Sequence, residues 1–326
     1  MNQTFFYELW PEPLVCVITA GASLRRGVEL ALAHARGRDC HILVRASWDL
    51  EIIGFEIVEA AARLAASHPN VTLTSLAPTR ADAAMMAVHG VRSLHASNAA
   101  FVDERIYAPS SAAAKAFDAI HNAQTGEFKR HELALGVPRL ALVTYDEAGS
   151  AEKVAALAGR YRDLRFVNWT RAGGHYYLNG SEVSHLIGQA CCGLALSEIE
   201  GPNNAIMEYR MCGTPLVTTP SRGGRDALND PDFVTVVAPR AEAVEAGVAA
   251  WSRRPADPWA VRAAALARVR PHRARLIAWL SAIVGRDLMV DADENLWLPS
   301  FHDKLRQLWR YAIDADGALT MERADI

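Results

Sequence analysis

One stretch in the second half of the chain constrains the fold more than any other. Gly193–Ser197 is a short apolar run that ends in a serine, and it predicts a buried strand. The polar turn Glu198–Asn204 follows, and Ala205–Cys212 then has helical spacing. Thr214–Thr219 predicts the next strand. A strand–loop–helix–strand unit of this kind is typical of a parallel α/β sheet.

The loop of this unit carries the chemistry. In a parallel sheet it lies at the carboxyl edge, where ligands bind. Its free N–H groups and the helix dipole point at one place, which favours a phosphate group. Glu200 precedes the helix and Glu208 lies about one turn inside it, so two carboxylates can face one pocket. The hydroxyl groups of a ribose or another sugar can donate hydrogen bonds to these carboxylates.

The spacing of these residues resembles a known signature. Glu200 and Glu208 enclose seven residues, E-GPNNAIM-E, followed by CGTPLVTT and a glycine pair. The segment 182–230 therefore resembles the donor site of the retaining family-4 glycosyltransferases, which have the GT-B fold. The resemblance implies that Glu208 holds the nucleotide's ribose and that Glu200 lies near the donor sugar as a catalytic residue. The residues that it assigns to donor binding are Gly201, Asn203, Asn204, Glu208, Gly223 and Gly224.

The cations for the diphosphate depart from the family pattern. That pattern usually places an arginine and a lysine after the first strand of the second domain. We take that strand as Leu140–Tyr145; no arginine follows it, and Lys153 is only a loose match. Lys129 and Arg130 precede the second domain and are our donor-binding candidates in their place. Two further candidates flank the glycine pair: Arg222 and Arg225.

Strands and helices alternate along most of the 326 residues, which predicts α/β architecture with two Rossmann-like, doubly wound parallel-sheet domains. The expected divisions are an acceptor-side domain over 1–135 and a nucleotide-sugar donor domain over 136–299. Residues 300–326 are expected to form a C-terminal helix that returns to the first domain. Within them, Phe301–Ile313 has an apolar helical stripe.

Composition excludes some classes and leaves others open. A net charge of −3 argues against a nucleic-acid partner, and five scattered cysteines fit a reducing cytoplasm. We expect neither a signal peptide nor a membrane span. The arginine-rich stretch 259–284 suggests peripheral contact with the inner face of a membrane, with solvated arginines on a packed helix as the alternative.

The remaining candidates concern the acceptor and a metal. His95 closes a predicted strand of the first domain, where a catalytic residue on the acceptor side would lie; a surface or core histidine is the alternative. Two short DxD patterns lie in the tail, Asp291–Asp293 and Asp314–Asp316, and we expect neither a metal site nor a cofactor. A magnesium ion held by acidic residues after residue 145 is the opposing case. Its ligands would be acidic residues such as Asp146 or Glu147.

These observations predict a glycosyltransferase. It would move a sugar from a nucleotide-diphospho-sugar, its co-substrate, to a hydroxyl group of a glycan, a lipid-linked or a small-molecule acceptor, without a metal. Retention of the anomeric configuration is implied by the resemblance alone. The alternatives are a non-catalytic nucleotide- or sugar-binding module, a nucleotide-sugar epimerase and a phosphorylase on the same fold.

Overall fold

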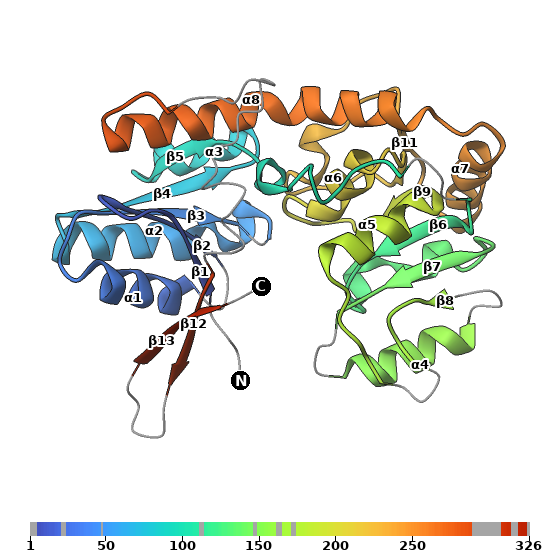
Figure 1. The fold of residues 1–326 in the computed structure, drawn as a ribbon, viewed down its shortest axis with the longest axis horizontal. Helices are drawn as coiled ribbons and strands as arrows, with labels where there is room; N and C mark the ends of the chain where they lie inside the picture. The colour runs from blue at the N-terminus through green and yellow to red at the C-terminus, as the bar shows by residue number, and fades with distance from the viewer. Residues whose placement is uncertain are drawn as a thin grey trace. The chain divides into compact units, whose positions relative to one another are not determined.

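The computed structural model describes residues 5–20, 24–46, 48–110, 114–145, 149–160, 165–170, 174–288, 308–313 and 319–324. The chain divides into two compact units, each with its own sheet and helices (Figure 1). Met1–Phe101 and Val269–Ile326 form the first unit, and Val102–Arg268 forms the second. The α/β class predicted from the sequence is confirmed.

The first unit is built on a mixed sheet in the order β13-β12-β1-β2-β3-β4-β5. Strands β2 to β5 are parallel and follow one another across the sheet without a reversal. Because parallel crossovers are right-handed, the three connecting helices lie on one face, and their buried residues share a core with the strands. The bounds are β1 Phe5–Trp10, β2 Leu14–Thr19, α1 Leu24–Ala35, β3 Cys40–Arg45, α2 Leu50–Ser67, β4 Val71–Ala77, α3 Arg80–Val88, β5 Arg92–His95, β12 Leu308–Ile313 and β13 Leu319–Ala324.

The C-terminal segment corrects one prediction. The helix expected over residues 301–313 is replaced, in its described part, by β12, which pairs antiparallel with β1 and β13. Trp309, Tyr311 and Ile313 are residues that favour strands, and pairing with β1 outweighs the helical spacing. Antiparallel strands therefore occupy the side on which a doubly wound sheet would continue. The chain does return to the first unit, but within α8 (Pro258–Val284).

The second unit has a fully parallel sheet in the order β11-β10-β9-β6-β7-β8. This is the doubly wound arrangement that the sequence predicts. The strand order reverses between β6 and β9, and ligands bind at the carboxyl ends of strands at such a switch point. The bounds are β6 Phe117–Asn122, β7 Leu140–Val143, α4 Ser150–Arg160, β8 Arg165–Phe166, α5 Gly180–Gly188, β9 Ala190–Ala195, α6 Asn204–Met211, β10 Leu216–Thr218, β11 Val234–Val236 and α7 Ala241–Arg253.

Strand β6 moves the domain boundary. The sequence predicted a second domain from residue 136, but β6, which begins before that residue, pairs with both β9 and β7. Its first five residues are all buried, as in a central strand, and that burial outweighs the helical preference of the preceding alanines. The unit that holds β9 and α6 therefore begins near residue 102.

The arginines of α8 are largely engaged in packing. Arg262 donates to the carbonyl oxygens of Tyr107 and Met211 at 2.7 and 2.8 Å, within the second unit. Arg273 and Arg275 donate to backbone carbonyls of the first unit. Membrane contact through this helix stays a prediction. Fewer of its arginines are available for such contact, because three of them bond backbone carbonyls. No helix in the described ranges is long and apolar enough to cross a membrane.

Candidate functional site at the switch point of the second sheet

Helix α6 is fixed against the two central strands of the second sheet. Gly193 in β9 lies directly under the ring of Tyr209, and a Cβ there would overlap that ring. The hydroxyl of Tyr209 accepts a hydrogen bond from the N–H of Asn122, at the end of β6, at 2.6 Å. Tyr209 is fully buried, so α6 is held at the point where β6 and β9 end.

The loop before α6 offers unpaired donors. The side chain of Asn203 accepts the N–H of Ala205 at 2.8 Å and caps the helix. The N–H groups of Gly201, Asn203 and Asn204 have no hydrogen-bond partner within the described ranges. The side-chain oxygen of Asn204 is buried and also has no partner there. Backbone N–H groups at the start of a helix suit a phosphate ligand.

Glu200 lies in this loop and is 8% exposed. Its Oε1 accepts hydrogen bonds from the Nζ of Lys129 and, at 3.1 Å, from Asn203, and its Oε2 accepts from the hydroxyl of Ser197. A buried carboxylate is tolerated only with such partners. Glu200 and Lys129, proposed separately from the sequence, are therefore in direct contact.

Lys129 reaches the site from the segment after β6. It is 8% exposed, and its Nζ lies 5.0 Å from the centre of the Phe128 ring. Because β6 is the first strand of this unit, Lys129 follows the first strand of the sheet that carries Glu200. The residues between Asn122 and Lys129 include no arginine.

Two buried histidines lie next to Lys129. The rings of His121 and His131 are 4.8 Å apart. Burial lowers the pKa of both, and the charge of Lys129 lowers them further. Both rings are therefore neutral near pH 7, and Lys129 is the cation of this group.

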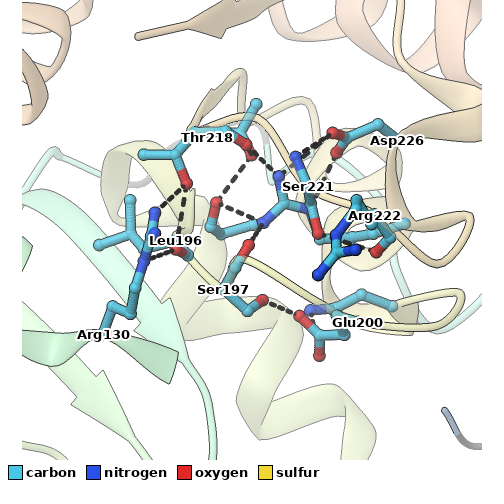
Figure 2. A network of polar contacts seen from close by, with 12 residues as sticks. Arg130, Leu196, Ser197, Glu200, Thr218, Ser221, Arg222 and Asp226 are labelled. Atoms are coloured by element: carbon cyan, nitrogen blue, oxygen red, sulfur yellow. Dashed lines mark hydrogen bonds and ion pairs between the residues drawn. The ribbon is translucent and has the colours of Figure 1, made fainter. Parts of the chain in front are cut away.

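Two arginines brace the loops that follow β9 and β10. Arg130 has a left-handed backbone (φ 51°), and its guanidinium donates to the carbonyl of Leu196 at 2.7 Å and to the hydroxyl of Thr219 at 2.9 Å (Figure 2). Arg225 is 3% exposed and donates to the carbonyls of Ala195 and Ser197 at 3.2 and 2.5 Å. Both side chains hold backbone in place, so a diphosphate role for Arg130 stays a prediction.

The glycine pair forms the turn between these loops. Gly223 and Gly224 have φ values of 93° and 86°, in the left-handed region that favours glycine. Just before them, Ile199 and Arg222 form a parallel bridge, and the carbonyl of Arg222 accepts the N–H of Glu200 at 3.0 Å. The predicted pair is thus next to the loop that carries Glu200.

Glu208 lies on α6, half-buried, and points toward β6. It accepts hydrogen bonds from the hydroxyl of Tyr107 and, at 3.4 Å, from the amide of Asn122. Burial raises the pKa of Glu208 to about 7, although both hydrogen bonds lower it. Burial and the nearby Glu208 carboxylate also raise the pKa of Tyr107. The group can accept hydrogen bonds from vicinal hydroxyls, as a ribose would require.

Comparison with known proteins addresses the fold. No family model matches the chain, and neither does any curated protein. Among solved structures, Anabaena Alr3699/HepE in complex with UDP and glucose superposes with a TM-score of 0.57 at 14% identity, over 82% of this chain and 78% of that one. The chain has the GT-B fold. The pneumococcal O-GlcNAc transferase GtfA with UDP and GlcNAc gives 0.50 at 13% identity, over 82% and 56%. A Staphylococcus aureus TarM variant with UDP gives 0.52 at 12%, over 74% and 50%.

His95 lies in the other unit of this GT-B chain, at the end of β5. Its ring packs edge-on against His272 of α8, 5.3 Å between centroids, and its carbonyl accepts from Arg275 at 2.5 Å. Burial lowers its pKa, as do the charges of Arg275 and Arg80. A catalytic role for His95 stays a prediction.

The metal-free site also stays a prediction for this GT-B chain. Within the described ranges, no group of three or more His, Cys, Asp or Glu side chains is placed to hold an ion. The acidic residues considered from the sequence lie outside those ranges: Asp146, Glu147, Asp291, Asp293, Asp314 and Asp316.

The sequence analysis missed three side chains of the site. Ser197 bonds Glu200, while Asn122 and Tyr107 bond Glu208. Ser197 was identifiable as the polar residue that ends the β9 run. Asn122 ends β6 in the same way, but the sequence analysis predicts no strand there.

Proposed function

We propose that this chain is a glycosyltransferase that moves a sugar from a nucleotide-diphospho-sugar to a hydroxyl group of a glycan, a lipid-linked or a small-molecule acceptor. One observation carries the proposal: N–H groups without a partner in the described part of the chain, a lysine and two carboxylates gather at the switch point between β6 and β9. The HepE, GtfA and TarM structures all contain UDP, so uridine nucleotides are the first ligands to test.

Each group of the site has a proposed task. The N–H groups of Gly201, Asn203 and Asn204, together with Lys129, hold the diphosphate. Glu208 accepts hydrogen bonds from the hydroxyls of the ribose, and Glu200 accepts a hydrogen bond from a hydroxyl of the donor sugar. Lys129 already contacts Glu200, so a phosphate oxygen has to share or replace that contact when the donor binds.

The reaction is a substitution at the anomeric carbon. The bond from that carbon to the phosphate oxygen breaks, and its electron pair stays on the nucleoside diphosphate. The acceptor oxygen forms the new bond, and its proton passes to the departing phosphate. Cations and N–H groups fixed beside the phosphate stabilise the developing charge, so the proposal needs no metal. Retention of configuration is part of the proposal through the family-4 resemblance.

Release of UDP from a panel of UDP-sugars, without an acceptor, tests this function. We expect slow hydrolysis of at least one donor, reduced by Glu200→Gln or Glu208→Ala. A non-catalytic module would bind without releasing UDP, and an epimerase would convert the donor into an isomer. Either outcome, or hydrolysis that both variants leave unchanged, rejects the proposed function.

A further inference from the structure

We infer that Arg222 supplies the second cation for the diphosphate and contacts the phosphate that bears the sugar. The inference rests on the proposed function. It addresses a gap in the site, because the segment from β6 to Lys129 has no arginine and one cation must balance two phosphates.

The backbone fixes where Arg222 stands. Its N–H donates to the carbonyl of Glu198 at 2.9 Å, and its carbonyl accepts the N–H of Glu200 at 3.0 Å. Figure 2 shows Arg222 and Glu200 in the same polar network, in which this backbone hydrogen bond makes them neighbours. Arg222 forms a parallel β-bridge with Ile199, and the left-handed turn at Gly223 and Gly224 follows it, so its backbone position is well defined.

The other cations around the loop already have partners. Lys129 contacts Glu200, Arg130 bonds Leu196 and Thr219, and Arg225 bonds the carbonyls after β9. The guanidinium of Arg222, by contrast, is exposed and makes no hydrogen bond or ion pair with the described ranges. It is therefore available to a ligand without breaking an existing contact.

The chemistry of an arginine suits this position. A guanidinium is always charged and can donate two parallel hydrogen bonds to a phosphate. Arg222 adjoins Glu200, the residue assigned to the donor sugar, whereas Glu208 faces the ribose. The phosphate nearest Arg222 is accordingly the one whose oxygen is bonded to the anomeric carbon before the reaction.

Calorimetric titrations of UDP, UMP and uridine test the inference; if the wild type binds GDP or ADP instead, that nucleotide, its monophosphate and its nucleoside take their place. The proteins are the wild type, Arg222→Gln, Arg222→Lys, and Arg253→Gln as a matched loss of an exposed arginine at the end of α7. We expect Arg222→Gln to weaken the affinity for UDP at least tenfold, while the affinities for UMP and uridine change less than twofold. Arg222→Lys should recover part of the loss, and Arg253→Gln should match the wild type.

The failures separate cleanly. If wild-type protein binds UDP but Arg222→Gln loses no affinity, or loses UDP and UMP equally, Arg222 is not the second cation and the proposed function stands. If the wild type binds none of UDP, GDP and ADP, the proposed function fails and this inference fails with it. Thermal unfolding of each variant confirms that the comparison is between folded proteins.

Discussion

Replacing Glu208 with glutamine should change how stability depends on pH. In the folded protein the pKa of Glu208 is about 7, because burial disfavours its charge, against an ordinary value of 4.5. Between these values the folded state keeps a proton that the unfolded state has lost. Stability from this group is therefore complete below pH 4.5 and is lost as pH rises through 7. At 1.36 kcal/mol per pKa unit, the full loss is about 3 kcal/mol.

The assay is thermal unfolding of wild type and Glu208→Gln from pH 5 to pH 8. Glutamine cannot ionise, so other titrating groups cancel in the difference between the two proteins. Relative to the wild type, we expect the variant to gain about 2 kcal/mol or more between pH 5 and pH 8, or roughly 4–8 °C in Tm for a unit of this size. Glu59→Gln, at an exposed position of α2, controls for removal of a surface carboxylate. A Tm difference that stays constant with pH would refute the reasoning.

Three further predictions follow from the same contacts. Lys129→Ala should destabilise the protein by about 3–5 kcal/mol, because it leaves the buried Glu200 carboxylate without its cation, and Glu200→Gln in the same chain should restore most of that loss in chemical denaturation. Relative to the wild type, the double variant should also lose more affinity for UDP than for uridine. Equal losses for the two ligands would count against Lys129 as a phosphate ligand. Gly193→Ala should lower stability by about 1–3 kcal/mol, measured by urea unfolding, because its Cβ overlaps the buried Tyr209 ring; an unchanged midpoint would show that the overlap is relieved. Turnover, once a donor is found, should survive EDTA, and full loss restored by magnesium would reject the metal-free mechanism.

The switch-point unit was predictable because its signals are local. The apolar run of β9, the capping asparagine and the glycine after α6 each act within a few residues of sequence. Glu200 and Glu208 are therefore found where their spacing indicated. Lys129 was also predicted, but its contact with Glu200 joins segments 71 residues apart and has no local signal.

Elements decided by long-range pairing were missed for the same reason. Strand β6 contains alanine, aspartate and histidine, and it is a strand because β9 and β7 supply its hydrogen bonds on both sides. Strand β12 has a helical stripe in sequence but pairs with β1, about 300 residues earlier in the chain. Misplacing β6 moved the domain boundary and hid Asn122 from the site.

The central claim is that the donor's diphosphate binds at the start of α6, between β6 and β9. A crystal structure of the protein with UDP tests this most directly. The account predicts phosphate oxygens at hydrogen-bond distance, about 2.7–3.2 Å, from the N–H groups of Gly201, Asn203 or Asn204, with the ribose hydroxyls on Glu208. A UDP molecule bound with its phosphates away from this loop, or its ribose away from Glu208, would contradict the account.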